Sequence, residues 1–176
     1  MLRRTREIVE QRRIFLADFW NSGPVSSGCI SAGRPRGYFH IDWDGDITPC
    51  AFVPYTTANI YEIYRNGGTL DDALRCSLFQ HIRRWQDEYG YAQTSAEKVG
   101  NWFCPCVIRD HDEVFLKAAR ETNAKPIDSE AEAALADPEY HRGLIEYGRQ
   151  VDELTREIWE REYIEPERQT QTVVSA

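Results

Sequence analysis

The feature that most constrains this fold is the stretch GCISAGRPRGYFHIDWDGDITPC, residues 28–50, in which two cysteines flank a predicted β-hairpin. The residues YFHID alternate between two faces, as the side chains of a β-strand do. The segment DWDGD that follows contains the glycine that a tight turn favours. The hairpin is therefore expected to hold Cys29 and Cys50 at defined positions near its ends.

Two further segments around this hairpin have helical patterns. Thr69, with Asp72 three positions later as a capping partner, begins a predicted helix that continues to Tyr89. Its apolar stripe is formed by Leu70, Leu74, Leu78, Ile82 and Trp85. Asp110 and Glu113 suit the capped start of a second helix after the sequence WFCPC.

The longest predicted helix runs from about Pro138 to Tyr163. Apolar residues recur in it at spacings of three and four, which predicts one narrow buried stripe: Tyr140, Leu144, Tyr147, Val151, Leu154 and Ile158. Core packing explains this stripe better than a coiled-coil dimer, because it spans fewer than three full heptads.

The charge and composition narrow the class of protein. The chain has 176 residues, 41% of them hydrophobic, and a formal net charge of −8, which repels nucleic acid. Charges interrupt the N-terminal segment, so it does not resemble a signal peptide, and no apolar run is long enough to span a membrane. We therefore expect a cytoplasmic protein without a nucleic-acid or membrane partner.

The cysteines are the main functional signal. There are five, an odd number, which in a reducing compartment favours metal ligation or reactive thiols over a disulfide framework. Cys104 and Cys106 are separated by one proline, a spacing that disfavours a disulfide between them. Thiolates suit zinc and iron–sulfur clusters, so Cys29, Cys50, Cys104 and Cys106 are candidate ligands.

The arrangement of these residues resembles a known family. Fifteen residues separate Cys29 from Gly45 and four separate Gly45 from Cys50, with Cys104-Pro-Cys106 far downstream. This spacing is similar to the auxiliary-cluster region of radical S-adenosylmethionine (SAM) enzymes, the SPASM or twitch domain. The segments DFWNSG, NIYEI and LFQHIR also resemble one branch of those enzymes, and the likeness covers residues 15–120.

The resemblance implies a [4Fe–4S] cluster held by Cys29, Cys50 and Cys106. Cys104 departs from the family pattern; it is either a fourth ligand or a bystander that leaves one iron open. Five cysteines suffice for one cluster, which matches the shorter twitch form. Cys76 lies in a predicted helix away from the apolar stripe, where the family has no ligand, and is expected to be incidental to the site.

The fold class that follows is α+β, a small β-hairpin cluster-binding core surrounded by helices, with a long C-terminal helix. Residues 1–22 would form an amphipathic helix, the end of a missing barrel, and residues 23–125 the SPASM/twitch-like domain. Residues 126–165 would form a helical extension, and residues 166–176 a disordered tail.

The sequence lacks the motif C-x-x-x-C-x-x-C that generates the radical in that family. The chain alone is therefore not expected to cleave SAM. It is expected to be an accessory electron-transfer or substrate-binding part, with a radical SAM barrel domain or chain as partner and a peptide or small molecule as substrate.

Two alternatives remain open at this stage. A structural zinc domain for protein interaction would use a mixed set such as Cys29, Cys50, Cys106 and His111. A metal-free remnant would bury the same cysteines as ordinary small hydrophobes. Other residues have a possible role beside a cluster: Arg34 and Arg36 would offset its charge or be solvated, and Trp43, Trp102 and Phe103 would shield it or form plain core.

Overall fold

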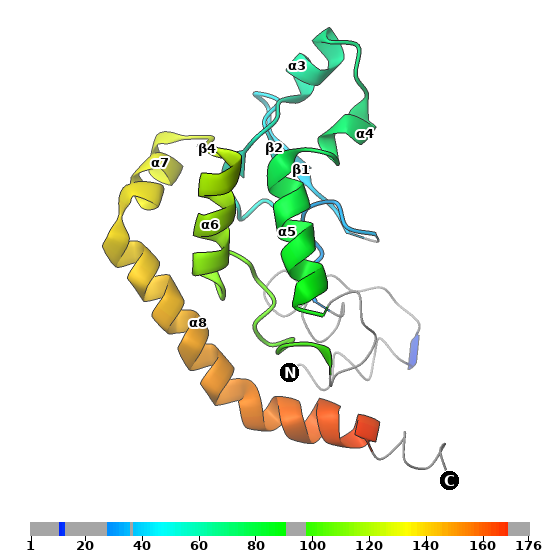
Figure 1. Cartoon of the computed structure of the whole chain (residues 1–176), viewed down its shortest axis with the longest axis vertical. Coiled ribbons are helices and arrows are strands. Elements are labelled where there is room, and N and C mark those ends of the chain that lie inside the picture. Colours follow the sequence, from blue (N-terminus) through cyan, green and yellow to red (C-terminus); the bar gives the residue numbers. More distant parts are fainter. Residues whose placement is uncertain (1–10, 13–27, 36, 91–97, 169–176) are drawn as a thin grey trace.

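The computed structural model describes residues 11–12, 28–35, 37–90 and 98–168. The amphipathic helix expected for residues 1–22 lies almost wholly outside these ranges, as do residues 169–176. The described part is a mixed α+β fold in which helices dominate, as the sequence predicts (Figure 1). The strands are β1 (His40–Ile41), β2 (Ile47–Thr48), β3 (Tyr55–Thr56) and β4 (Lys125–Pro126). The helices are α3 (Ile60–Arg65), α4 (Leu70–Ala73), α5 (Ser77–Glu88), α6 (Asp112–Thr122), α7 (Ser129–Ala136) and α8 (Pro138–Trp159), followed by the π-helix η2 (Glu160–Ile164).

The predicted hairpin is present. Strands β1 and β2 pair antiparallel, with His40 opposite Thr48 and Ile41 opposite Ile47. Asp42 closes the turn, because its Oδ1 accepts the backbone N–H of Asp46 at 2.8 Å. Gly45 has φ +83°, a conformation that L side chains rarely adopt, so the turn needs a glycine there. Strands β3 and β4 form a second antiparallel pair.

The prediction of a single helix over residues 70–89 is wrong, because the structure has two helices there, α4 and α5. The capping box of Thr69 and Asp72 is present, yet the chain leaves the helical conformation at Cys76, where ψ is 148°. The guanidinium of Arg83 donates to the carbonyl of Leu74 and so satisfies an acceptor at the break. As a result Leu70 is 47% exposed, whereas Leu78 and Ile82 are buried as predicted.

Helices α5 and α6 lie side by side and form the main core with the strands (Figure 1). The ring of Tyr55 packs on Phe115 at 4.9 Å between centroids, and Phe39 packs edge-on to Phe79 at 5.6 Å. Helix α6 begins as predicted, but His111 stands at its N-cap position, and Asp110 has a different role described below. The helix ends at Asn123, which adopts the left-handed conformation.

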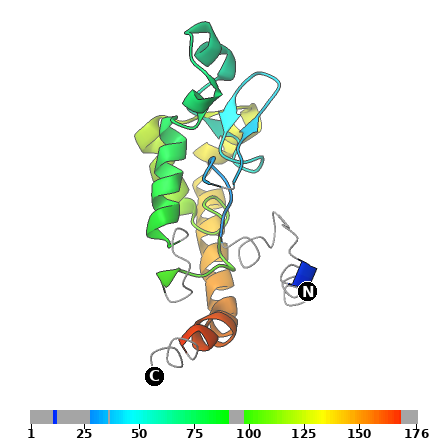
Figure 2. The same cartoon turned by 90° about the vertical axis from the view of Figure 1, so that its right-hand side faces the viewer.

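Helix α8 extends along one side of the molecule from α7 towards the C-terminal end (Figures 1 and 2). Asp137 caps it by accepting the N–H groups of Glu139 and Tyr140. Helical structure continues through residues 165–168, beyond the expected end at residue 165. The described residues include no helix long and apolar enough to cross a membrane.

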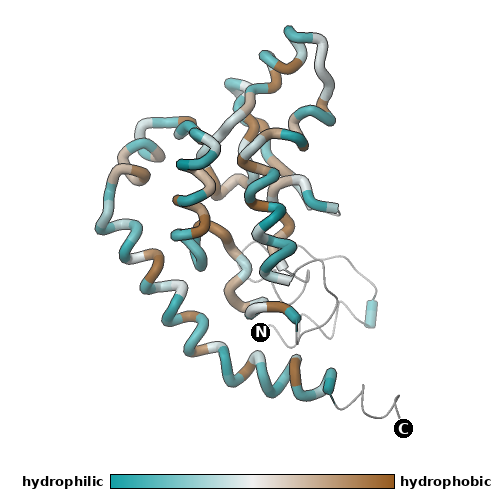
Figure 3. Tube along the Cα trace, in the orientation of Figure 1, coloured by the Kyte–Doolittle hydropathy of each residue, from teal (hydrophilic) through white to brown (hydrophobic). Residues whose placement is uncertain are grey.

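The buried face of α8 differs from the predicted stripe. Tyr140, Tyr147 and Leu154 are 45% exposed or more, and Ile158 is 36% exposed. The buried residues lie about one position further along the chain and are His141, Gly148 and Trp159. Most residues of α8 are hydrophilic, with short hydrophobic interruptions along the helix (Figure 3). Helix α8 therefore packs through the pair of His141 and Asp112, through Gly148 and through Trp159. A search for apolar periodicity does not detect such contacts.

Candidate functional site

Three of the four candidate cysteines meet at one cavity. Cys29, Cys50 and Cys106 line a space of about 40 Å³. The other lining residues are mainly apolar or aromatic: Ile30, Ser31, Tyr38, Phe52 and Pro105. The thiol of Cys29 is close enough to those of Cys50 and Cys106 for their charges to interact. Segments far apart in the sequence thus bring together the three residues that the family resemblance assigns as ligands.

A backbone hydrogen bond connects the segments that carry Cys29 and Cys50. Ala32 donates its N–H to the carbonyl of Pro49 at 2.8 Å, which ties the loop after Cys29 to the residue before Cys50. Helix α5 supports the same loop through Gln86, whose side-chain amide lies 3.3 Å from the hydroxyl of Ser31. Gln86 is buried, so this support is shielded from water.

Hydrogen-bonding groups surround the three sulfur atoms. Phe52 donates its backbone N–H to Cys50 Sγ at 3.5 Å, and the hydroxyl of Tyr38 lies 2.9 Å from the same sulfur. The Cys29 thiol donates to the hydroxyl of Ser31 at 3.0 Å. Backbone groups of Ser31 near Cys29, and of Arg109 and Ile108 near Cys106, act to lower the pKa of those thiols against the effect of burial. Donors placed around a sulfur stabilise its thiolate form and tune a bound metal group.

The loop that carries Cys106 is held by a buried ion pair. Asp110 Oδ2 accepts the N–H of Cys106 at 2.9 Å, and the N–H of Asp110 donates back to the carbonyl of Cys106 at 2.9 Å. Arg109 binds both oxygens of the Asp110 carboxylate, at 2.6 and 2.7 Å. The Arg109 guanidinium also lies within electrostatic range of the Cys106 sulfur. Its charge is already paired with Asp110, and the Asp110 carboxylate adds to the effect of burial in raising the pKa of the Cys106 thiol.

Helix α8 packs against the loop that carries Cys106. The side-chain amide of Asn101 donates to Asp152 Oδ1 and to Thr155 Oγ1, both at 2.9 Å. Gly148 lies so close to the loop that a Cβ there would be 2.2 Å from the carbonyl oxygen of Asp110. The segment predicted as an extension is therefore in contact with the loop that carries Cys106.

The electrostatics argue against a reactive cysteine. Burial raises the pKa of the Cys29 thiol above its ordinary value, and it raises that of Cys106 to about 12. Reactive cysteines have lowered pKa values, since the thiolate is the nucleophile. Without a bound metal, Cys29 and Cys106 are therefore neutral thiols at pH 7, and a metal that binds them must displace their protons.

Cys104, Cys76 and His111 lie apart from the cavity lining. Cys104 is buried, interacts with the hydroxyl of Thr155 on α8, and has its pKa raised to about 12 by burial. Cys76 belongs to the main core, in agreement with its expected structural role. The Nε2 atom of His111 lies 2.9 Å from the carbonyl oxygen of Cys104, and its ring packs on Tyr89. Cys106 lines the cavity and Cys104 does not, so the two sulfurs do not meet at one site as they would from one face of an extended strand.

A second hydrophobic cluster packs beside Cys29. It is built around Val99 and Trp159, and Cys29 contacts it together with Trp102 and Phe103. The other members are Trp85, Tyr89, Tyr163 and Ile164, and we call this set the aromatic cluster. Trp102 and Phe103 therefore pack in the same hydrophobic cluster as Cys29, although neither lines the cavity. The same expectation for Trp43 is wrong, because its side chain stands at the hairpin turn and is 88% exposed.

Arg34 and Arg36 were expected either to offset charge or to be solvated, and the structure describes only Arg34. Arg34 donates to the carbonyl of Cys29 at 2.8 Å and so supports the loop backbone. Arg36 lies outside the described residues. Sequence reasoning missed Tyr38, Gln86 and Arg109, because no motif marks a hydroxyl, an amide or a cation that reaches a site from elsewhere in the fold.

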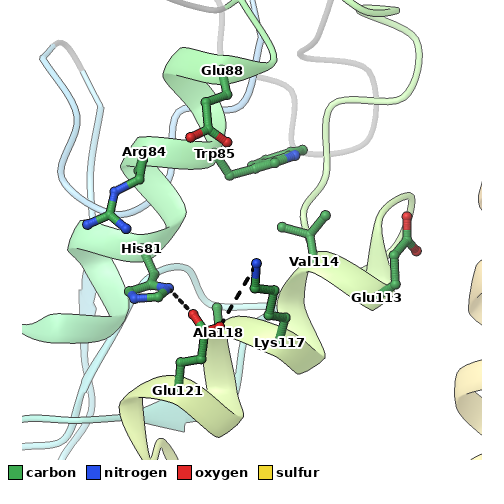
Figure 4. Close-up of a pocket in the computed structure, with 9 residues that line it drawn as sticks. All are labelled: His81, Arg84, Trp85, Glu88, Glu113, Val114, Lys117, Ala118 and Glu121. Atoms are coloured by element: carbon green, nitrogen blue, oxygen red, sulfur yellow. Dashed lines mark ion pairs between the residues drawn. The ribbon is translucent and has the colours of Figure 1, made fainter.

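A larger groove of about 340 Å³ lies between α5 and α6 (Figure 4). Its walls carry charges of both signs, and Glu121 pairs with His81 at 3.4 Å and with Lys117 at 3.9 Å. Trp85 forms part of the wall. The groove shares no lining residue with the cysteine cavity.

No group of three or more His, Cys, Asp or Glu side chains is arranged to hold a single metal ion in the ranges that the structure describes. Comparisons with family models, with curated proteins and with solved structures found no match to this chain. The site is therefore interpreted from its own chemistry.

Proposed function

We propose that this chain binds one iron–sulfur cluster through Cys29, Cys50 and Cys106. The observation that carries the proposal is the meeting of the three thiols at one cavity, with hydrogen-bonding groups beside their sulfurs. A cluster of four irons spans several atoms, so its ligands need not converge on one point as zinc ligands must.

The surroundings of the three thiols support the same conclusion. A thiolate-ligated cluster carries negative charge, and the partly buried guanidinium of Arg109, paired with Asp110, lies within electrostatic range of Cys106. The aromatic cluster packs on Cys29 and excludes water from that side. Cys104 contacts Thr155 instead of the cavity, so we propose three protein ligands and a structural role for Cys104.

The proposed role is that of an accessory module of a radical SAM enzyme. When bound, the cluster supplies electron transfer or a site for substrate at an iron without a protein ligand. The partner would be a radical SAM barrel domain or chain, and the substrate a peptide or small molecule. We also propose a cytoplasmic location, since the five cysteines are all free thiols.

Anaerobic reconstitution with iron and sulfide tests this proposal. The wild-type chain should turn brown and bind about four iron and four sulfide. Alanine at Cys29, Cys50 or Cys106 should abolish that binding, whereas Cys76→Ala, the control, should retain it. Full iron content in Cys50→Ala would refute the assignment. A colourless protein with one tightly bound zinc would instead establish the zinc domain.

A further inference from the structure

The hydroxyl of Tyr38 is placed to act on the Cys50 sulfur. The O···S distance is 2.9 Å, whereas the backbone N–H of Phe52 approaches the same sulfur only to 3.5 Å. Tyr38 also lines the cavity. It is therefore the nearer of the two donors to Cys50, and it comes from a residue twelve positions earlier in the chain.

The position of Tyr38 is fixed by its backbone. Its N–H donates to the carbonyl of Ile30 at 2.9 Å, and its own carbonyl accepts the N–H of Gly33 at 3.0 Å. Both partners belong to the loop that follows Cys29. Gly37 permits this close approach, because a Cβ there would lie 2.3 Å from the carbonyl oxygen of Ile30. Tyr38 thus links the Cys29 loop, through its backbone, to Cys50, through its side chain.

A metal-bound Cys50 has no proton, so the bond can then run in only one direction, from the Tyr38 O–H to the sulfur. A hydrogen bond to an ionised acceptor is stronger than one between neutral groups. The cavity wall beside it includes Ile30, Phe52 and Pro105, and a wall of low polarity strengthens the bond further.

We infer that Tyr38 sets the reduction potential of the cluster by donating a hydrogen bond to the Cys50 thiolate. This inference rests on the proposed function. Reduction adds an electron to the cluster, which increases the negative charge on its sulfur ligands, so a donor stabilises the reduced form more than the oxidised form. Tyr38 is a positioning and tuning residue, and it forms no bond to iron.

The test compares Tyr38→Phe with Tyr55→Phe, each reconstituted with iron and sulfide in the absence of air. Both variants lose one hydroxyl group and one 2.9 Å hydrogen bond, but Tyr55 donates to the carbonyl of Ala131, away from the cysteines. Redox titration followed by electron paramagnetic resonance measures the midpoint potential. We expect the midpoint potential of Tyr38→Phe to lie about 59 mV below that of the wild type. For a one-electron step this is a tenfold decrease in the equilibrium constant for reduction. Tyr55→Phe should match the wild type.

A second variant keeps the test decisive if Tyr38→Phe fails to retain its cluster. Replacing Tyr38 by 3-fluorotyrosine preserves the ring and makes the hydroxyl a stronger donor, so the potential should rise above that of the wild type. Unchanged potentials in whichever of the two variants hold a cluster would overturn the inference while leaving the cluster assignment intact. A wild-type chain that binds no iron would instead overturn the proposed function.

Discussion

The carboxylate of Asp110 accepts the backbone N–H of Cys106 while Arg109 binds both of its oxygens. The Asp110 side chain is fully buried, so its removal leaves a largely buried guanidinium without its partner. Loss of one member of such a pair costs roughly 3–5 kcal/mol. We predict that Asp110→Ala lowers the free energy of unfolding by this amount and reduces iron binding, as measured by urea titration and metal analysis.

The control for this variant is Asp128→Ala. Asp128 also accepts a backbone N–H, that of Ala131, but it does so as the N-cap of α7. Its loss should cost about 1 kcal/mol and leave the iron content unchanged. Equal iron content in Asp110→Ala and the wild type would show that the Cys106 loop does not depend on Asp110.

Two glycines of α8 provide a matched pair. At Gly148 a Cβ would meet the Asp110 carbonyl oxygen at 2.2 Å, whereas at Gly143 nothing lies within 4 Å. Gly143→Ala should stabilise the chain by about 0.5–1 kcal/mol, because alanine favours the helix. Gly148→Ala should instead destabilise it by roughly 1–3 kcal/mol through overpacking. Thermal unfolding of both variants checks this, and a stabilised Gly148→Ala would contradict the close approach of α8 to the loop.

The sequence predicted the parts of this fold that depend on local chemistry. The turn around Gly45, the Thr69–Asp72 capping box and the start of α8 after Asp137 all follow from short-range rules. The sequence did not predict the break at Cys76, because the apolar pattern does not record the bond from Arg83 to the Leu74 carbonyl that satisfies an acceptor there. The face of α8 was also misassigned, since Gly148 and His141 are buried for reasons that an apolar pattern does not record.

At the site, too, local sequence patterns were predictive and tertiary contacts were not. Cysteine spacing identified Cys29, Cys50 and Cys106, which share a cavity. Spacing could not determine the orientation of Cys104, because that depends on how the loop of Cys104 packs in the folded chain. The supporting residues Tyr38 and Arg109 reach the sulfurs through the folded structure, so only the structure reveals them.

Cys104 should behave as a core residue. Its thiol is buried beside α8, outside the cavity that the other three cysteines line. We predict that Cys104→Ala keeps full iron binding and loses roughly 0.5–3 kcal/mol of stability, a typical cost of a core truncation. Metal analysis and urea unfolding of the same preparation check both parts. Loss of iron in a variant that remains folded would make Cys104 a fourth ligand.

The pair of Asp112 and His141 links α6 to α8 and predicts a pH dependence of stability. Asp112 Oδ2 lies 2.7 Å from His141 Nδ1, and burial raises the pKa of Asp112 although this bond opposes the shift. A carboxyl that binds its proton more tightly in the folded state stabilises the fold at low pH. That contribution is complete below about pH 4, the pKa of an unfolded aspartate, and is lost as the pH rises through the raised pKa.

Asp112→Asn removes this titration. The free energy of unfolding of the wild type minus that of the variant should therefore decrease as the pH rises from about 4 towards neutrality. Urea unfolding at a series of pH values measures the difference directly. A difference that increases with pH would mean that the bond to His141 outweighs the cost of burying the carboxylate.

If the chain binds the proposed iron–sulfur cluster, the aromatic cluster should protect it from air. Trp159 is fully buried, stacks on Tyr163 at 4.8 Å, and belongs to the aromatic cluster that packs on Cys29. Trp159→Ala should cost about 3–5 kcal/mol and open this side of the site to water and oxygen. We predict that the reconstituted variant bleaches faster than the wild type in air. The loss of colour is measured by absorbance, at a temperature well below that of unfolding.

Two variants separate this effect from general instability. Phe115→Ala removes a fully buried ring from the main core and should cost a similar amount, yet it leaves the aromatic cluster intact. Trp43→Ala removes a tryptophan that is 88% exposed and should change neither stability nor bleaching. If Phe115→Ala bleaches as fast as Trp159→Ala, destabilisation alone explains the loss, and the aromatic cluster has no specific protective role.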